Sequence, residues 1–340
     1  MRFSVQQASG SLGVCGMQAK MKESAMNFKL GKQRVADILA RSAMRVPALE
    51  KLIAVGCRQP GLRKLGLGAV AHGYSRVLKR PELRIATFDT YKLWVNVAEP
   101  LGIEPFFFGQ TCAAWLVPLL IGAGDVCVDG GANVGPYTFL MASIVGKGGR
   151  VFAFEANPEM LELLSRSVSL NDYGSFVEVV PRALWSVADE EMTFYVSTES
   201  MNTGTSSLVD HGLFVSPDHT IRVTTTTLDQ FALDHSLQRL HLVKLDVERA
   251  EDHVLRGTEN LLRDERIDYL IVELFSNTET ERILQQHGYS GFLLDFSQRR
   301  LRPLANVPSG TFCDVLFVRS GLLDEFVQRF SLMIEPVKNG

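Results

Sequence analysis

Hydrophobic positions in the first third of the chain follow helical spacing and then begin to alternate. Between residues 31 and 55, Pro47 suits the first turn of a second short helix, and the apolar positions of the first helix are Val35, Ile38, Leu39 and Ala43. The runs at 82–88 and 91–98 alternate between apolar and polar residues, as the strands of a hairpin do. The pattern predicts a helical and hairpin cap over residues 29–110, preceded by a poorly ordered leader over residues 1–28.

From residue 111 onward, short apolar runs are separated by helical segments. Seven runs have the length and apolar content of strands, at 125–129, 150–155, 176–180, 242–246, 268–273, 292–296 and 312–318. This alternation is typical of an α/β fold built on a mainly parallel sheet. We therefore predict a seven-stranded, mainly parallel sheet in a domain over residues 111–320, followed by a C-terminal helix and tail over residues 321–340.

The connections between these strands are mostly helical, with one long exception. Asn157 and Pro158 provide an N-cap and a first-turn residue for a helix over 158–170, and an apolar stripe predicts another helix over 249–264. The exception is an insertion over residues 183–235, which contains two predicted strands and a loop rich in Ser, Thr and Asn. Because long loops in compact domains are usually functional or disordered, we expect this insertion to act as a lid or substrate loop.

Composition fits a globular protein but reveals an uneven distribution of charge. Hydrophobic residues make up 46% of the chain and charged residues 21%, which excludes fibrous and disordered classes. Residues 1–90 hold 16 Lys and Arg against 5 Asp and Glu, a balance of +11, whereas the remaining 250 residues hold 19 against 33, a balance of −14. A basic front of this kind is typical of a region that meets an anionic partner.

The cysteines and the apolar segments indicate the cellular compartment in which the protein is expected. The five cysteines lie far apart and form no C-x-x-C pair, so neither a disulfide framework nor a zinc ribbon is indicated. The first 30 residues lack the apolar core of a secretory signal, and the most apolar stretch, at 113–124, is too short to span a bilayer. We expect a cytoplasmic protein without a transmembrane segment.

The sharpest motif is the segment VCVDGGANVGPY at 126–137, where an apolar strand ends in Asp129 and a helix begins at Pro136. Glycines at such a turn let a ligand approach the backbone amides, and a helix N-terminus offers unpaired N–H groups. The spacing G-G-x-x-x-G differs from the G-x-G-x-x-G of dinucleotide-binding enzymes, and Pro136 stands where a P-loop has lysine. Conventional dehydrogenases and P-loop NTPases are therefore disfavoured.

A nucleoside-like ligand whose tail is not a phosphate fits this loop better. Glu155 ends the second strand, 26 residues after Asp129, where an acidic side chain can bind both hydroxyls of an adenosine ribose. Asp129 would repel a pyrophosphate but suits a sulfonium group. The two residues together predict S-adenosylmethionine as the cofactor, with an atypical dinucleotide-binding oxidoreductase as the alternative.

Five sequence blocks occur in a characteristic order: DGGANVG, FAFEANP, TTLDQF, VKLDVERAEDHVLRG and LIVEL. Over about residues 105–320 their order and spacing resemble those of the FkbM-type methyltransferases. The resemblance implies a class I, Rossmann-like, S-adenosylmethionine-dependent enzyme that methylates a hydroxyl of a sugar or secondary metabolite. It also implies cofactor contacts from Asp129, Gly131, Asn133 and Gly135 at the methionine end, Glu155 at the ribose and Asn157 in the loop behind it.

Two residues depart from the pattern of that family. Ala156 stands where proline is common, and Arg249 replaces the usual glycine of the D-V-E-G-A-E block. The side chain of Arg249 is a bulky cation beside the predicted active-site strand, where it could contact an anionic substrate.

Methyl transfer from a sulfonium is an in-line displacement, and an alcohol acceptor must also lose its proton to a base. The carboxyl ends of the fourth and fifth strands carry the catalytic candidates, which are Asp246, Glu248 and Glu273, with Glu251 nearby. We expect a carboxylate near Asp246 to be the base or orienter, although each acid also has a structural interpretation at a turn or helix start. Lys244 is either a snorkelling edge residue or a partner of these acids, and His241 and His253 are weaker candidates.

A metal-assisted version of the reaction is the secondary interpretation. Asp246 together with Glu273 or Asn277 would place oxygen ligands at two adjacent strand ends, as Mg²⁺ prefers. The sequence offers no third evident ligand, so no metal site is assigned.

The partner classes follow from the same residues. The expected acceptor is a hydroxyl of a glycan or small molecule, and the aromatic residues that either wall its pocket or pack the cap are Phe106, Phe107, Phe108 and Trp115. A non-catalytic module that binds an anionic partner through the basic front is a further alternative. Nucleic acid is disfavoured because the front lacks aromatic-interleaved RNA motifs and a helix-turn-helix. The sequence leaves the oligomeric state open.

Overall fold

The computed structural model consists of two compact units, residues 1–80 and residues 81–340. The structure describes residues 31–59, 62, 66–109, 114–197, 203–209, 215–276 and 278–336. The leader expected over residues 1–28 lies outside the described residues. Within the described ranges, no helix is both long enough and apolar enough to cross a bilayer.

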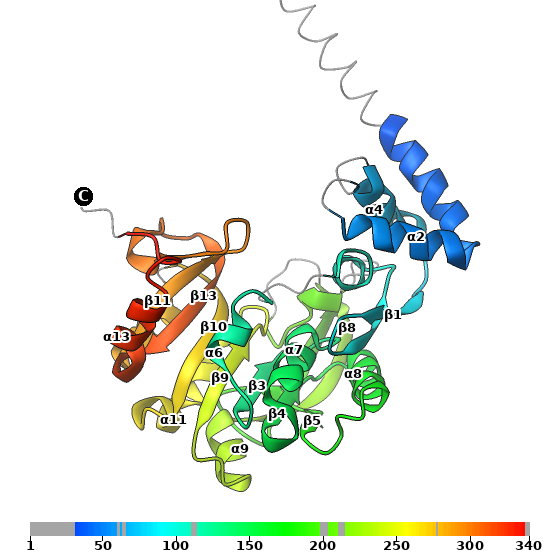
Figure 1. Ribbon diagram of the computed structural model, residues 1–340. Helices are drawn as coiled ribbons and strands as arrows, with labels where there is room; N and C mark the ends of the chain where they lie inside the picture. Colours follow the sequence, from blue (N-terminus) through cyan, green and yellow to red (C-terminus); the bar gives the residue numbers. More distant parts are fainter. Residues whose placement is uncertain are drawn as a thin grey trace, which may run out of the picture. The chain divides into compact units, whose positions relative to one another are not determined.

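The first unit is helical (Figure 1), with a helix at residues 31–44 followed by α2 (Pro47–Cys57) and α4 (Gly68–Val77). Pro47 opens α2 as predicted. The first helix buries only its small residues, which are Ala36, Ala40 and Ala43. The helix buries its alanines because it packs closely on α4 at Gly73. A Cβ atom on Gly73 would lie 3.0 Å from the Cβ of Ala40, so only small residues fit between the two helices. The larger residues of the predicted stripe point outward.

The second unit contains an eight-stranded sheet with the order β12-β11-β13-β10-β9-β3-β4-β5. Its strands are β3 (Val126–Gly130), β4 (Arg150–Phe154), β5 (Val177–Val180), β9 (Leu240–Leu245), β10 (Ile267–Phe275), β11 (Tyr289–Asp295), β12 (Arg300–Pro303) and β13 (Phe312–Arg319). Neighbours from β10 to β5 pair in parallel, and the remaining neighbours pair antiparallel. All seven predicted strands are present in a mixed, mainly parallel sheet, and β12 adds an eighth at the edge.

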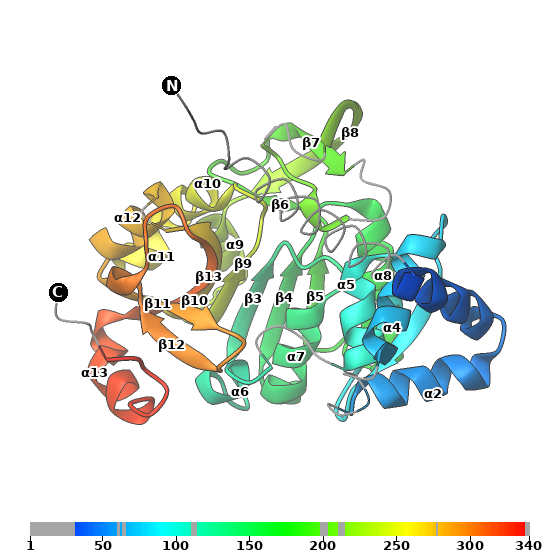
Figure 2. The same cartoon turned by 90° about the horizontal axis from the view of Figure 1, so that it is seen from above.

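Helices cover both faces of this sheet, as expected for an α/β fold. One face packs against α9 (Leu228–Asp234), α10 (Glu251–Arg256), α11 (Glu259–Arg263) and α12 (Glu279–Gln286), whose apolar residues share one core with Val243 and Leu245. Lys244 alternates with these two residues and lies near Tyr137 of α7 (Pro136–Val145), so α7 covers the opposite face. Figure 2 shows α7 in front of β3 and β4.

The predicted helix over residues 249–264 is divided into α10 and α11. The division falls at Gly257, where a Cβ atom would lie 2.1 Å from the carbonyl oxygen of Trp185. The helical segment is therefore interrupted where it contacts Trp185 of the insertion. By contrast, α8 (Pro158–Leu170) has the predicted bounds, and the Asn157 side chain accepts a hydrogen bond from the Glu159 amide as its N-cap.

A hairpin and a small sheet complete the surroundings of the central sheet. The hairpin of β1 (Leu83–Thr87) and β2 (Lys92–Asn96) is antiparallel and packs on α8, where the Trp94 amide donates to Ser167 Oγ at 2.9 Å. The insertion forms a three-stranded sheet of β6 (Ala183–Leu184), β8 (Val215–Thr226) and β7 (Glu191–Ser197), in that order.

The C-terminal segment lies along the far edge of the sheet. Helix α13 (Ser320–Arg329) buries Phe326, and the chain then returns to β12. The Leu301 amide donates to the Met333 carbonyl at 2.9 Å, and the Glu335 amide donates to the Leu301 carbonyl at 2.8 Å. The last residues of the predicted tail, 337–340, lie outside the described residues.

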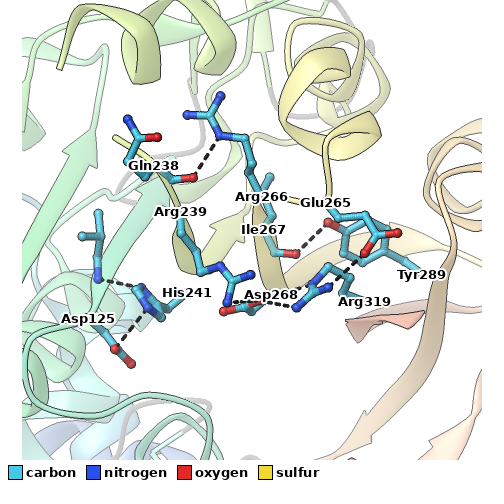
Figure 3. A network of polar contacts seen from close by, with 11 residues as sticks. Asp125, Gln238, Arg239, His241, Glu265, Arg266, Ile267, Asp268, Tyr289 and Arg319 are labelled. Carbon is cyan, nitrogen blue, oxygen red and sulfur yellow. Dashed lines mark hydrogen bonds and ion pairs between the residues drawn. The ribbon is translucent and has the colours of Figure 1, made fainter. Parts of the chain in front are cut away.

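A polar network lies at the amino ends of β9 and β10 (Figure 3). Arg319 donates to Glu265 at 2.9 Å and to Asp268 at 3.2 Å, and Arg239 approaches Asp268 at 3.7 Å. His241 accepts a hydrogen bond from the Val126 amide at 3.0 Å. These residues hold neighbouring strands together at the sheet edge opposite the glycine loop.

Candidate active site

The turn between β3 and α7 depends on backbone conformations that favour glycine. Gly131, Asn133 and Gly135 have φ angles of 77°, 52° and 90°. A Cβ atom on Gly131 would lie 1.9 Å from the carbonyl oxygen of Asp246, so only glycine fits between this turn and the end of β9. The glycine loop and the acidic segment after β9 are therefore in direct backbone contact.

Asp129 lies beneath this loop rather than on its surface. The carboxylate is buried and accepts a hydrogen bond from Thr138 Oγ1 of α7 at 2.5 Å. Burial raises the pKa of Asp129 to about 6, although the hydrogen bond from Thr138 opposes the shift. Neither Asp129 nor Gly135 lines the two cavities described below, whereas Gly131 and Asn133 do line the first of them.

Glu155 fixes the shape of the same loop from the end of β4. One carboxylate oxygen accepts from the Asn133 amide at 2.8 Å, and the other accepts from the amides of Ala156 and Asn157 at 2.8 and 2.7 Å. Burial raises the pKa of Glu155, and the three amide bonds act in the opposite direction. The side chain that the sequence assigned to a ribose thus also links the glycine loop to the start of α8.

Asn157 offers a hydrogen-bond donor that the protein leaves unused. Its Oδ1 caps α8, but its Nδ2 is buried and has no partner among the described residues. Buried donors without partners are rare in folded proteins because they cost free energy. Since Asn157 lines the first cavity, its Nδ2 is suited to an acceptor atom of a bound ligand.

The first cavity, which we call the loop cavity, lies between the glycine loop and the insertion. Its walls include Gly131, Glu155 and Asn157 on one side and Phe194, Ser206 and Leu208 on the other. Its volume is about 60 Å³, well below the range typical of small-molecule sites. A nucleoside-sized ligand therefore needs more room than the cavity offers in this structure.

All three predicted catalytic acids meet at the carboxyl ends of β9 and β10. Asp246, Glu248 and Glu273 each present a carboxylate oxygen within 4.8 Å of the other two. Lys244 is fully buried beneath them, with its Nζ 3.2 Å from Asp246 and 3.6 Å from Asp314. The structure thus identifies Lys244 as the partner of these carboxylates.

Burial, with nearby negative charge as the second cause, raises the pKa values of two acids in this cluster. Burial raises the pKa of Glu248 to about 8 and that of Glu273 to about 9, and the negative charge of Asp246 adds to both shifts. Burial lowers the pKa of Lys244, but the surrounding carboxylates outweigh this effect and hold it above its usual value. At neutral pH the cluster therefore combines a charged lysine with glutamic acids that are still protonated.

The turn that carries Glu248 is tight and specifically supported. Glu248 and Arg249 both have positive φ angles, of 53° and 74°. Glu251 Oε1 accepts from the amides of Val247 and Arg249 at 3.2 and 3.3 Å, so this acid stabilises the turn. Ser207 of the insertion donates to the Glu248 carbonyl at 2.7 Å, which ties the insertion to the same turn.

A second, larger cavity of about 650 Å³ opens on the other side of this turn, and we call it the acidic cavity. It is lined by Arg249, Glu273, Phe275 and Phe312, among others, and Glu248 lines both cavities. The rings of Phe275 and Phe312 lie 4.9 Å apart, and the Arg249 guanidinium is 5.5 Å from the Phe275 ring. Glu248 thus stands where the two cavities meet.

Phe275 and Phe312 are site residues that sequence reasoning missed. They face each other because β10 and β13 pair antiparallel in that register. The aromatic residues named from the sequence lie elsewhere: Phe107 and Phe108 are buried, and none of Phe106, Phe107, Phe108 and Trp115 lines either cavity. Only the pairing of β10 with β13 could have indicated the correct pair.

The two histidines named as candidates from the sequence, His241 and His253, lie outside the site. His241 lies at the opposite sheet edge, and His253 stacks on Trp185 with a ring separation of 4.0 Å. Neither lines the loop cavity or the acidic cavity. Asn277, named from the sequence as a secondary metal ligand, lies outside the described residues.

The chain is similar to known methyltransferases. Residues 129–290 match the model of the methyltransferase FkbM domain. The hexuronic acid methyltransferase AglP of Haloferax volcanii is 26% identical over 159 residues, which are 47% of this chain and 59% of that protein. The chain thus spans somewhat less than two thirds of the length of this relative.

The solved structures found to be similar to this chain include two methyltransferases. A methyltransferase FkbM from Methylobacillus flagellatus has 15% identity and a TM-score of 0.35, with 82% of this chain and 60% of that chain covered. A tRNA (uracil-54, C5)-methyltransferase of Pyrococcus abyssi, solved with S-adenosyl-L-homocysteine, has 14% identity and a TM-score of 0.37, with 70% and 44% covered.

Proposed function

We propose that the chain is a methyltransferase of the FkbM family that transfers a methyl group from S-adenosylmethionine to a hydroxyl of a sugar or related metabolite, because residues 129–290 match the model of the methyltransferase FkbM domain. One observation carries the proposal. The loop cavity, whose lining residues suit the cofactor once it widens, and the acidic cavity, which suits the acceptor, share Glu248 beside Asp246 and Glu273. A donor methyl and an acceptor hydroxyl would therefore face each other among carboxylates.

The residues of the loop cavity fit the cofactor. Glu155 would accept hydrogen bonds from the ribose hydroxyls, the free Nδ2 of Asn157 would donate to the nucleoside, and Gly131 and Asn133 would line the methionine end. When bound, S-adenosylmethionine supplies the electrophilic methyl group. The chain holds the acceptor oxygen in line with that group and removes its proton.

Glu248 is our choice for the base, and Asp246 for the orienting residue. Asp246 is paired with buried Lys244, so its charge is already balanced. The pKa of Glu248, raised to about 8, makes its carboxylate a stronger proton acceptor than an ordinary glutamate. Glu248 also lines both cavities, as a residue at the point of transfer must.

The acidic cavity has the character of a carbohydrate site. Carboxylates accept hydrogen bonds from sugar hydroxyls, and the faces of Phe275 and Phe312 can pack against the apolar face of a sugar ring. The name of the Haloferax relative describes a hexuronic acid as its substrate, and Arg249 offers a cation for such an acidic sugar. We therefore place sugars first among the acceptors.

We propose that the transfer needs no metal. The ligand atoms of Asp246, Glu248 and Glu273 lie close enough together to hold a divalent cation, but Lys244 already places a positive charge 3.2 Å from Asp246. Enzyme treated with a chelator should keep its rate. A rate that falls on chelation and returns with Mg²⁺ would make the cluster a metal site instead.

Two measurements test the proposal. Calorimetry with S-adenosylhomocysteine should show binding to the wild-type protein and to Glu248→Gln, whereas transfer of labelled methyl to a panel of neutral and acidic sugars should fall about 10²–10⁴-fold in the variant. Absence of binding up to millimolar ligand would contradict the cofactor assignment. Thermal protection by NAD alone would favour the oxidoreductase alternative.

A further inference from the structure

The helix at residues 31–44 of the first unit turns its large aliphatic side chains to solvent. Val35, Ile38 and Leu39 are 57%, 62% and 46% exposed, whereas its alanines are buried. Because these three residues are spaced at i, i+3 and i+4, they form one continuous stripe. A helix that served only the core of its unit would bury this stripe and expose its alanines.

Positive charges accompany the stripe. Arg34 and Arg41 are exposed and seven residues apart, so they lie on the flank of the helix next to Ile38, and Arg45 in the turn that follows the helix is also exposed. In the described part of this unit, the acidic side chains do not neutralise the charge of these arginines. Asp37 binds Arg76 at 2.6 Å, and Glu50 is buried.

The neighbouring helix α2 also exposes aliphatic and basic side chains. Leu52 and Val55 of α2 are exposed at i, i+3 spacing, and Lys51 beside them is exposed as well. Exposed aliphatic residues bordered by Lys and Arg are the composition of helices that lie in the interface of a membrane. Proteins that bind single-stranded nucleic acids use aromatic side chains for stacking, which the described helix does not offer. Arginines that bind a duplex need no exposed aliphatic stripe beside them, because their contacts are to phosphates.

We propose that the first unit binds to the surface of an anionic lipid membrane through this basic aliphatic face, defined by Val35, Ile38 and Leu39 with Arg34, Arg41 and Arg45. The aliphatic side chains enter the boundary between headgroups and acyl chains, and the arginines pair with anionic headgroups. The proposal does not depend on the methyl transfer proposed above, because its residues belong to the other unit.

Vesicle sedimentation with the full chain tests this binding. Vesicles of phosphatidylcholine with about 30% phosphatidylserine should pellet the protein, and the bound fraction should fall steeply between about 50 mM and about 500 mM salt because screening weakens the arginine contacts. Pure phosphatidylcholine should bind at least about tenfold more weakly. Equal and salt-independent binding to both vesicles would overturn the role of the arginines, and absence of binding to either would overturn the proposal.

Two triple variants and their matched controls assign the binding to this face. Val35→Ser/Ile38→Ser/Leu39→Ser and Arg34→Gln/Arg41→Gln/Arg45→Gln should each weaken vesicle binding about tenfold or more. The control Val187→Ser/Leu233→Ser/Leu332→Ser removes three exposed aliphatic residues from the other unit and should leave it unchanged. So should Arg222→Gln/Arg263→Gln/Arg282→Gln, which removes three exposed arginines there. S-adenosylhomocysteine affinity and circular dichroism verify that each variant is folded.

Two outcomes would replace the membrane by another partner. Binding of a single-stranded oligonucleotide that the serine variant retains and the glutamine variant loses would identify a nucleic-acid surface. Dimers in sedimentation velocity that only the serine variant dissociates, without any vesicle binding, would identify a second copy of the chain as the partner.

Discussion

At Gly131, both the backbone conformation and the packing exclude any larger residue. Its φ of 77° and the Asp246 carbonyl 1.9 Å from an added Cβ both oppose any side chain. Gly131→Ala should therefore displace the glycine loop from the end of β9 and weaken S-adenosylhomocysteine binding more than about tenfold, because Gly131 lines the loop cavity. The positive φ should in addition cost about 1–2 kcal/mol of stability. Calorimetry measures the affinity.

Gly310 provides the matched control for that substitution. It has a φ of 78°, but an added Cβ there would meet nothing within 4 Å. Gly310→Ala should cost stability of about 1–2 kcal/mol and leave cofactor affinity unchanged. Equal affinities in the two variants would show that the contact with Asp246 is irrelevant to the ligand.

As the proposed base, Glu248 gives methyl transfer a pH dependence whose sign can be stated. In the proposed reaction its carboxylate form accepts the proton, and burial together with Asp246 and Glu251 raises the pKa of Glu248 to about 8. The rate of methyl transfer should therefore increase as the pH rises through about 8, and Glu248→Gln should lose this increase along with most of the rate. Rates under saturating cofactor from pH 6 to 10 give the profile. Cofactor affinity should stay flat over the same range, and a parallel change would assign the pH effect to binding.

Individual acids could be predicted from the sequence better than individual aromatics. Asp246, Glu248 and Glu273 follow the ends of strands that the apolar pattern revealed, and ends of parallel strands share one edge of a sheet. Phe275 and Phe312 meet only through the register of two antiparallel strands far apart in sequence. No local pattern encodes that register.

At the scale of elements, Glu251 determines whether the turn before α10 keeps its shape. It holds two amides of a turn with two successive residues at positive φ. Glu251→Ala should cost about 1–3 kcal/mol of unfolding free energy, because it leaves these amides unsatisfied, and it should lower methyl transfer by displacing Glu248. Urea unfolding and initial rates measure the two effects. Glu251→Gln retains an acceptor oxygen and should restore most of both; a glutamine variant as defective as the alanine variant would assign the charge itself a role.

The elements themselves were largely predictable, and the exceptions have local causes. Alternating and continuous apolar runs revealed the seven strands, and Asn157 marked the start of α8. The division between α10 and α11 was missed because it depends on Gly257 meeting the backbone of Trp185, a contact between distant segments. Strand β12 was missed because its sequence, Arg-Leu-Arg-Pro, is too polar to be recognised as a strand.

At the scale of the whole molecule, the network in Figure 3 stabilises the sheet at the edge opposite the site. Asp268→Ala would leave the largely buried guanidinium of Arg319 with only Glu265 as a partner. We expect a loss of about 3 kcal/mol in unfolding free energy, seen as a lower urea midpoint, with cofactor affinity unchanged. The exposed pair of Arg263 and Asp264 is the control, since Asp264→Ala should cost less than about 1 kcal/mol. Equal losses would show that burial does not matter here.

The distribution of charge along the chain indicated a basic front, and its aliphatic face could not be foreseen. Helical spacing grouped Val35, Ile38 and Leu39 correctly, but a stripe of this kind normally faces the core. The exposure of the stripe follows from the close approach of α4 at Gly73, which selects the alanine side of the helix for burial. Cytoplasmic location remains a prediction from composition alone.

The return of the chain past β12 has a consequence for colloidal behaviour. An outer strand with free amides and carbonyls is a template on which other chains add and aggregate. Here Met333 and Glu335 occupy the outward groups of Leu301, and Pro303 has no amide to offer. The segment over residues 333–335 therefore covers part of this edge strand. A protein shortened before Met333 should scatter more light during storage at high concentration than the unshortened protein, even with Asp246, Glu248 and Glu273 unchanged.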